Sequence, residues 1–154
     1  MNELDELYQE LIIDHSRHPR NFHRIEGCGH ANCVTAEGAN PLCGDKLTIY
    51  LEISDDRITD LSFEGSGCAI FTASASLMTE ALQGLSVEAA HTKLKGFLRL
   101  LTGEAEAGTS QKMGKLIALA GVREFPMRVK CATLAWRTVE AAFNGGRTTA
   151  STEL

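Results

Sequence analysis

A thiol and a carboxylate stand two residues apart in the segment NPLCGDK, at Cys43 and Asp45. The Asn, Pro and Gly of this segment favour a turn, and a run that alternates like a β-strand follows directly. Such a pair on a turn either has no chemical role or supplies two ligands of a metal site. The second interpretation requires further ligands from distant parts of the chain.

Two more cysteines stand at predicted helix boundaries. Cys68 follows the flexible segment Gly65–Gly67, and Cys131 lies in the first turns of the last predicted helix. A helix N-terminus lowers the pKa of a thiol, and thiolates are what soft metals and electrophilic sulfur require. The long gaps between the three cysteines form no local signature. Each cysteine taken singly therefore also fits the role of a small buried apolar residue.

The composition is that of a globular domain without a nucleic-acid or membrane function. The 154 residues are 44% hydrophobic and 23% charged, and the formal net charge is −5. Non-specific nucleic-acid binding needs a basic surface, which this charge does not favour. No apolar run approaches the ~20 residues that span a bilayer, and the acidic start is unlike a secretory signal. We therefore expect a cytoplasmic protein whose five cysteines stay reduced and form no disulfide framework.

The first half of the chain is expected to supply one helix and a small sheet. Apolar residues at helical spacing predict the helix, and strict alternation predicts the clearest strand. The alternation of the return strand is imperfect, because Ile58 and Leu61 have opposite parity. The predicted elements are a helix ended by Pro19, a loop over 22–40 with a short strand near Cys33, and strands over 47–53 and 58–63.

The second half is expected to be helical. Ser86 can cap one helix, and Pro126 suits the start of another. The predicted elements are helices over 68–83, 86–101, 116–120 and 126–143, with a polar linker over 103–111. Early strands and late helices predict an α+β class, with a small antiparallel sheet covered on one face. Residues 1–144 form one predicted domain, and 145–154 a flexible C-terminal tail.

Four ordered motifs carry a family resemblance from about Leu4 to Phe143. They are DHSRHPRN, NPLCGDK, GSGCAIFTASASLMTEAL and FPMRVKCATLAW. In these motifs the chain resembles the iron–sulfur cluster assembly proteins of the IscU/SufU-like family, which implies their fold. The segment between about His91 and Gly121 looks like the insertion of the SufU-type branch. Lys130 stands where the scaffold branch carries a histidine, and that branch's Leu-Pro-Pro-Val-Lys chaperone-binding motif is absent.

The resemblance implies a zinc site built from Cys43, Asp45, Cys68 and Cys131. In the SufU-type branch the cysteine of the Cys-Gly-Asp motif, here Cys43, accepts persulfide sulfur from a pyridoxal-phosphate cysteine desulfurase. The resemblance also implies downstream cluster-assembly proteins as partners. Three thiolates and a carboxylate can complete a tetrahedral zinc site. Arg128, one helical turn before Cys131, either positions the partner or the persulfide, or is an ordinary solvated cation.

Two other functions remain open from the sequence. The same four residues can ligate iron or a [2Fe–2S] cluster, which makes a scaffold that hands clusters to apo-proteins the alternative. A structural zinc domain without transfer chemistry is the third interpretation. Asp45 argues against it, because a purely structural zinc site is more often closed by cysteine or histidine.

The segment CGHANC adds Cys28, His30 and Cys33, which lie outside the four motifs. They can hold a second metal, pass sulfur onward, or belong to a loop without such a role in which Cys33 is partly buried on a strand. His15 has no support as a ligand and is interpreted as a surface or satisfied core residue. We expect Cys28 and Cys33 to be dispensable for the principal activity.

Overall fold

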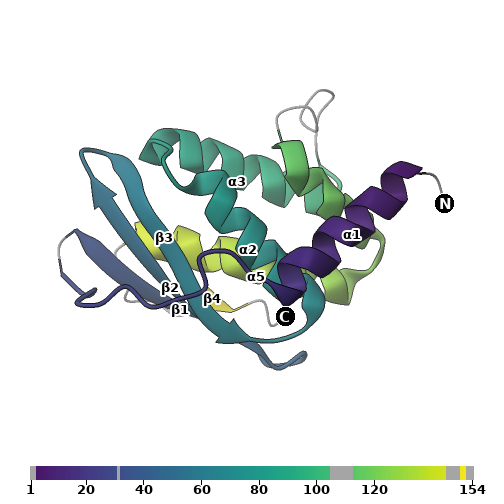
Figure 1. Cartoon of the computed structure of the whole chain (residues 1–154), viewed down its shortest axis with the longest axis horizontal. Coiled ribbons are helices and arrows are strands. Elements are labelled where there is room, and N and C mark those ends of the chain that lie inside the picture. The colour runs from purple at the N-terminus through teal and green to yellow at the C-terminus, as the bar shows by residue number, and fades with distance from the viewer. Residues whose placement is uncertain (1–2, 31, 105–112, 145–149, 152–154) are drawn as a thin grey trace.

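A β-sheet forms one layer of the molecule, and helices cover one of its faces (Figure 1). The computed structural model describes residues 3–30, 32–104, 113–144 and 150–151. In chain order the elements are α1 (Glu3–Arg17), β1 (Cys33–Asn40), β2 (Asp45–Ser54), β3 (Arg57–Ser66), α2 (Ala69–Leu82), α3 (Val87–Thr102), the 3-10 helix η1 (Gly114–Glu124), α5 (Pro126–Phe143) and β4 (Ala150–Ser151). The predicted α+β class is confirmed. None of the described helices is long and apolar enough to cross a membrane.

The sheet has the strand order β3-β2-β1-β4, in which β4 pairs parallel to β1 and the other pairs are antiparallel. On β2, Leu47, Ile49 and Leu51 are buried, as their alternation predicts. A register shift between Glu52 and Ile53 inserts one extra residue into β3. This bulge explains the imperfect alternation of the return strand, because a single inserted residue reverses the parity of the side chains.

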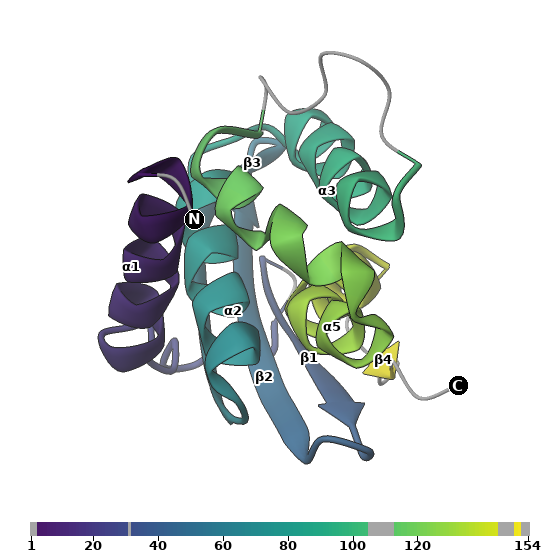
Figure 2. The same cartoon turned by 90° about the vertical axis from the view of Figure 1, so that its right-hand side faces the viewer.

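Strand β1 is longer than the short strand expected near Cys33, because it pairs with β2 from Cys33 to Asn40, and α5 packs against it. A Cβ atom on Gly38 would lie 2.0 Å from Oγ1 of Thr138, so only glycine lets the helix approach the strand this closely. The side chain of Ser74 on α2 donates to the carbonyl of Ala132 on α5 and accepts from the indole N–H of Trp136. These contacts fix α2 and α5 side by side over the sheet (Figure 2).

The helix ends follow their capping residues. Ser86 Oγ accepts the N–H of Ala89 at the start of α3, and Gly103 ends that helix with a left-handed φ of 80°. Pro126 begins α5, as predicted. The helix expected over 116–120 is a longer 3-10 helix, η1. Most of the predicted linker and of the predicted flexible tail lies outside the described residues.

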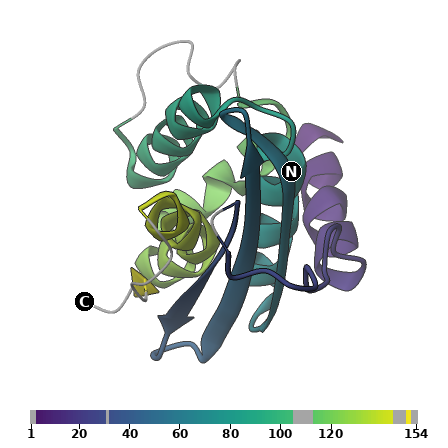
Figure 3. The same ribbon diagram turned by 90° about the vertical axis from the view of Figure 1, so that its left-hand side faces the viewer.

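Helix α1 docks on α2 through a buried histidine. The side chain of His15 is 1% exposed, its Nδ1 lies 2.7 Å from Oγ of Ser76, and its Nε2 lies 3.5 Å from Glu80. Ser76 Oγ also accepts the N–H of Arg20. From there the chain crosses the sheet toward β1 (Figure 3), and the N–H of Phe63 donates to the carbonyl of Asn21. His15 is therefore a satisfied core residue.

We expect His15 to make the fold less stable in mild acid. Burial, and secondly the charge of Arg20, hold the pKa of His15 below its ordinary value of 6.5. The unfolded chain therefore binds a proton that the folded chain does not. The contribution of this group to the free energy of unfolding should be complete above pH 6.5. Below pH 6.5 it should decrease by up to about 1.4 kcal/mol per pH unit.

The measurement is urea unfolding of the wild type and of His15→Gln between pH 7.5 and 5. The variant should be less stable at neutral pH but should show a shallower loss of stability on acidification. Parallel pH profiles for the two proteins would contradict the assignment.

Candidate metal centre

The turn between β1 and β2 presents Cys43. The carbonyl of Asn40 accepts the N–H groups of both Cys43 and Gly44, at 3.2 and 2.9 Å, and Pro41 begins the turn. Gly44 has a φ of 75°, which favours glycine because it lacks a Cβ atom. Cys43 is half-buried, so its sulfur is held in place and remains accessible. The glycine of the Cys-Gly-Asp motif is therefore what allows the chain to turn between the two side chains.

Asp45 is the first residue of β2 and is almost completely buried. Its Oδ1 accepts the backbone N–H of Cys68 at 3.0 Å, whereas its Oδ2 has no hydrogen-bond partner. A Cβ atom on Gly67 would lie 2.3 Å from Oδ1, so that glycine lets the loop before α2 close over the carboxylate. A buried carboxylate oxygen without a partner is costly unless a cation or donor meets it.

Cys68 is the N-cap of α2 and lies beside Asp45. Its sulfur accepts the N–H of Phe71 at 3.4 Å, so it caps the helix whose first turn it precedes. The Cys68 side chain is exposed, in contrast to the other thiols of the site. Cys68 lies at the start of α2, as predicted, and its backbone N–H donates to the Asp45 carboxylate.

Cys131 lies on α5 and is 4% exposed. Its thiol donates to the sulfur of Cys43 across 3.4 Å, although the two residues lie 88 positions apart in the chain. Burial raises the pKa of the Cys131 thiol, and the neighbouring Asp45 carboxylate and the sulfurs of Cys43 and Cys68 raise it further. Without a cation, the site therefore favours the thiol form of Cys131.

One ligand atom each from Cys43, Asp45 and Cys131 lie within 4.8 Å of one another. Among the described residues this is the only such group of cysteine, histidine and acidic side chains. Cys68 lies beside this group, but its sulfur is not within that distance of the other ligand atoms, because it faces the N-terminus of its own helix. Two thiols and a buried carboxylate with one unpaired oxygen fit a zinc ion, which binds sulfur and oxygen donors.

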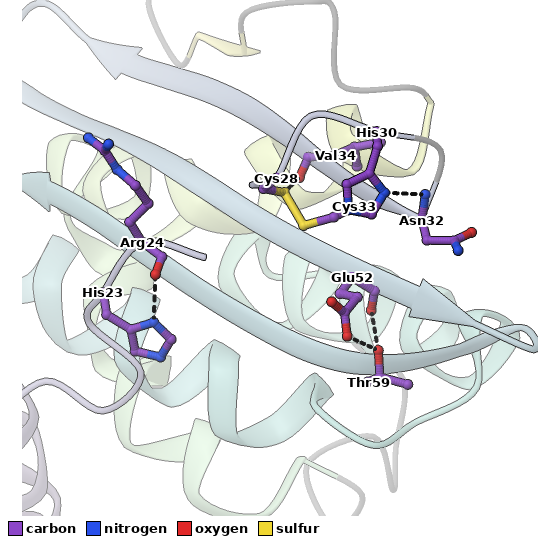
Figure 4. The surroundings of a disulfide bond; sticks show 9 residues. All are labelled: His23, Arg24, Cys28, His30, Asn32, Cys33, Val34, Glu52 and Thr59. Carbon is purple, nitrogen blue, oxygen red and sulfur yellow. Dashed lines mark hydrogen bonds between the residues drawn. A yellow bond between two sulfur atoms is a disulfide. The ribbon is translucent and has the colours of Figure 1, made fainter. Parts of the chain in front are cut away.

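The structure pairs Cys28 with Cys33 in a disulfide (Figure 4). The turn through His30 brings their Cα atoms to 5.0 Å, within the range that a disulfide spans. The expectation that all cysteines stay reduced is therefore wrong for this pair, and the paired sulfurs are unsuitable as metal ligands. The ring of His30 accepts the N–H of Asn32 instead.

The disulfide is also remote from Cys43. Cys33 begins β1 and Asn40 ends it, and a strand of 8 residues separates its ends by about 23 Å. Sulfur cannot pass directly from Cys43 to this pair within one molecule.

The double variant Cys28→Ser, Cys33→Ser is expected to be less stable by about 2 kcal/mol, because the cross-link restricts the unfolded chain. Its zinc binding should equal that of the wild type. Urea unfolding under oxidising and reducing conditions measures the first effect, and the reduced wild type should match the variant. A loss of zinc in the double variant would show that the CGHANC segment contributes to the centre.

Arg128 is exposed near the start of α5, and its guanidinium lies 4.7 Å from the ring centre of Phe125. This cation–π contact leaves the donors of the guanidinium free to face a partner, and the positioning role of Arg128 stays a prediction.

Sequence reasoning missed Asn40, whose side chain is completely buried. Its place in the strand register opposite Asp45 was the signal that could have identified it.

The chain belongs to the family of NifU-like N-terminal domains, whose model matches residues 7–132 and so includes all four predicted ligands. It is 39% identical over 137 residues to the zinc-dependent sulfurtransferase SufU of Bacillus subtilis, covering 89% of each chain. It is 35% identical over 142 residues to the iron–sulfur cluster assembly scaffold protein IscU of Streptococcus pyogenes, covering 92% of this chain and 86% of that one.

A solved structure confirms the fold. It is a Fervidobacterium islandicum protein described as an iron–sulfur cluster assembly scaffold for the SUF system. It superposes with a TM-score of 0.77 at 34% identity, over 88% of this chain and 96% of that one. The predicted membership of the IscU/SufU-like family is confirmed by these relatives.

Proposed function

We propose that this protein serves iron–sulfur cluster assembly as a zinc-dependent sulfurtransferase, accepting persulfide sulfur from a cysteine desulfurase at Cys43. The proposed zinc ligands are Cys43, Asp45, Cys68 and Cys131. The observation that carries the proposal is the convergence of Cys43, Asp45 and Cys131 at one buried point, with Cys43 on an accessible turn. A relative named for zinc-dependent sulfur transfer supports this chemistry.

The four residues have different parts in this proposal. Asp45 and Cys131 are buried and anchor the centre, whereas Cys43 and Cys68 lie where a partner can reach them. Zinc, when bound, supplies the positive charge that keeps the thiols ionised. To close a four-ligand sphere, Cys68 must turn its sulfur from the N–H of Phe71 toward the group.

Sulfur transfer then needs one exchange step. The Cys43 thiolate attacks the outer sulfur of the desulfurase persulfide, and a new S–S bond forms as the bond within that persulfide breaks. The electron pair leaves on the desulfurase cysteine, which takes up a proton. No external oxidant is consumed, because the sulfur moves at constant total oxidation state. The half-buried position of Cys43 leaves one side open for this attack.

The surface around Cys43 suits protein docking. Leu42 is 58% exposed beside Cys43, and Phe125 and Met127 at the start of α5 are 48% and 46% exposed. Large apolar side chains near a reactive group are typical of interaction surfaces. Arg128 adds a positive charge at the same helix start, which can meet an acidic group of the desulfurase or the persulfide itself.

The test is sulfur transfer in the absence of iron. Zinc-loaded protein is incubated with a cysteine desulfurase and isotope-labelled cysteine, and the persulfide is located by mass spectrometry after alkylation. Label on Cys43 without iron supports the proposal. Label confined to the desulfurase, under conditions in which that enzyme turns over, contradicts it.

A scaffold function is the second candidate, because two relatives carry that description and the same thiols can ligate a [2Fe–2S] cluster. Iron and sulfide are added to the protein, and transfer of a coloured cluster to an apo-acceptor is followed. Efficient transfer that zinc inhibits would favour the scaffold. Sulfur on Cys43 with no transferable cluster would favour the sulfurtransferase.

A further inference from the structure

The side chain of Asn40 is completely buried at the end of β1, and neither its Nδ2 nor its Oδ1 has a hydrogen-bond partner. Four buried side-chain atoms of the described residues lack a partner, namely these two, Oδ2 of Asp45 and Oγ of Ser62. Buried polar atoms in folded proteins are almost always paired. Three of the four unpaired atoms therefore belong to two residues at one end of the sheet.

The strand register brings these two residues together. Asn40 pairs with Asp45 across β1 and β2, and partners in an antiparallel pair point to the same face. That face is the one that α5 and Cys131 cover, since Asp45 has the parity of the buried residues of β2. The Asn40 carbonyl also holds the turn of Cys43. The amide side chain therefore lies on the face of Asp45, and its own residue anchors the turn that presents Cys43.

Two members of the site already receive backbone donors. The N–H of Cys68 donates to Asp45 Oδ1, and the N–H of Phe71 donates to the sulfur of Cys68. The sulfurs of Cys43 and Cys131 share one thiol hydrogen, which is lost once both are thiolates. Two thiolates and a carboxylate already exceed the charge of one divalent cation. An additional N–H donor would stabilise the two sulfurs.

We propose that Asn40 is a positioning residue of the metal centre. Its Nδ2–H, which has no partner in this structure, would donate to a ligand sulfur of the Cys43–Cys131 pair once the metal is bound. The inference rests on the proposed metal centre. Asn40 does not ligate the metal, because an amide oxygen is a poor match for a site of soft thiolates. It stabilises the charged sulfurs and holds them at the edge of the sheet. Partners of this kind commonly change metal affinity 10–100-fold when they are lost.

The experiment uses Zn²⁺ affinity by competition with a chromogenic chelator, and the thiolate-to-metal charge-transfer band of the Co²⁺ form. Asn40→Leu keeps the approximate size of the side chain and removes both polar atoms, and Asn40→Asp replaces the donor with an acceptor. We expect Asn40→Leu to weaken Zn²⁺ binding about 10–100-fold and to shift the Co²⁺ band. Asn40→Asp should weaken binding more, because it adds negative charge beside the thiolates.

Stability without metal separates this role from a purely structural one. Apo Asn40→Leu should be as stable as apo wild type or more so, because it buries no unpaired polar atom. Ser62→Ala is the matched control, since Ser62 Oγ is also buried and unpaired but pairs in register with Tyr50 on the opposite face of the sheet. This control should leave the metal affinity and the Co²⁺ band unchanged.

The outcomes distinguish the inference from the proposed function. Unchanged affinity and an unchanged Co²⁺ band in both Asn40 variants, with normal metal binding by the wild type, would overturn the role of Asn40 alone. Equal losses in Ser62→Ala would also overturn it. A wild-type protein that binds neither Zn²⁺ nor Co²⁺ through thiolates would overturn the metal centre and the role of Asn40 together.

Discussion

Replacing Cys43 with serine is expected to abolish sulfur acceptance while leaving the fold intact. A serine hydroxyl is not ionised at neutral pH and cannot attack a persulfide, so transfer should fall by on the order of 10³-fold or more. The fold should survive, because Cys43 is half-buried on a turn that backbone hydrogen bonds to Asn40 hold in place. Labelled sulfur on the protein measures the first effect, and circular dichroism measures the second.

The double variant Cys28→Ser, Cys33→Ser is the matched control, because it removes two sulfurs remote from Cys43 and should accept label as the wild type does. Cys131→Ser provides a second comparison. It should lose metal and sulfur acceptance together, since Cys131 is a buried member of the same group. Persulfide found on the Cys43→Ser protein in wild-type amounts would mean that another thiol is the acceptor.

Removing the metal is expected to lower the melting temperature substantially without unfolding the protein. Metal that binds only the folded state adds RT ln(1 + [L]/Kd), which is about 4 kcal/mol at a free concentration 1,000 times Kd. For a chain of this length that corresponds to a shift of about 10 °C. The apo protein should stay folded, because the buried cluster from the sheet and the helices contains only Cys131 of the four proposed ligands.

Differential scanning fluorimetry with zinc, and after treatment with a strong chelator, measures this shift, and far-ultraviolet circular dichroism follows the secondary structure. Asp45→Ala serves as the variant control, since chelator should then change its melting temperature much less. Complete loss of secondary structure on chelation would show that the core depends on the metal. An unchanged melting temperature of the wild type would contradict the proposed centre.

The sequence by itself determined the elements and their order. Alternation over β2, the serine cap of α3 and the proline at the start of α5 are local signals, because each depends on residues within one or two turns of the chain. The NPLCGDK turn is local for the same reason. The family resemblance identified which three cysteines and which aspartate to compare, although it could not show how they meet.

Only the tertiary structure decided which of these side chains come together and which polar atoms remain unpaired. Cys43 and Cys131 meet because α5 packs on β1 at Gly38, a contact between segments about a hundred residues apart that no local pattern encodes. The Cys28–Cys33 disulfide depends on a short turn whose geometry the composition does not reveal. Asn40 became visible only through strand register and burial, because the cost of an unpaired polar atom arises when packing excludes water from it.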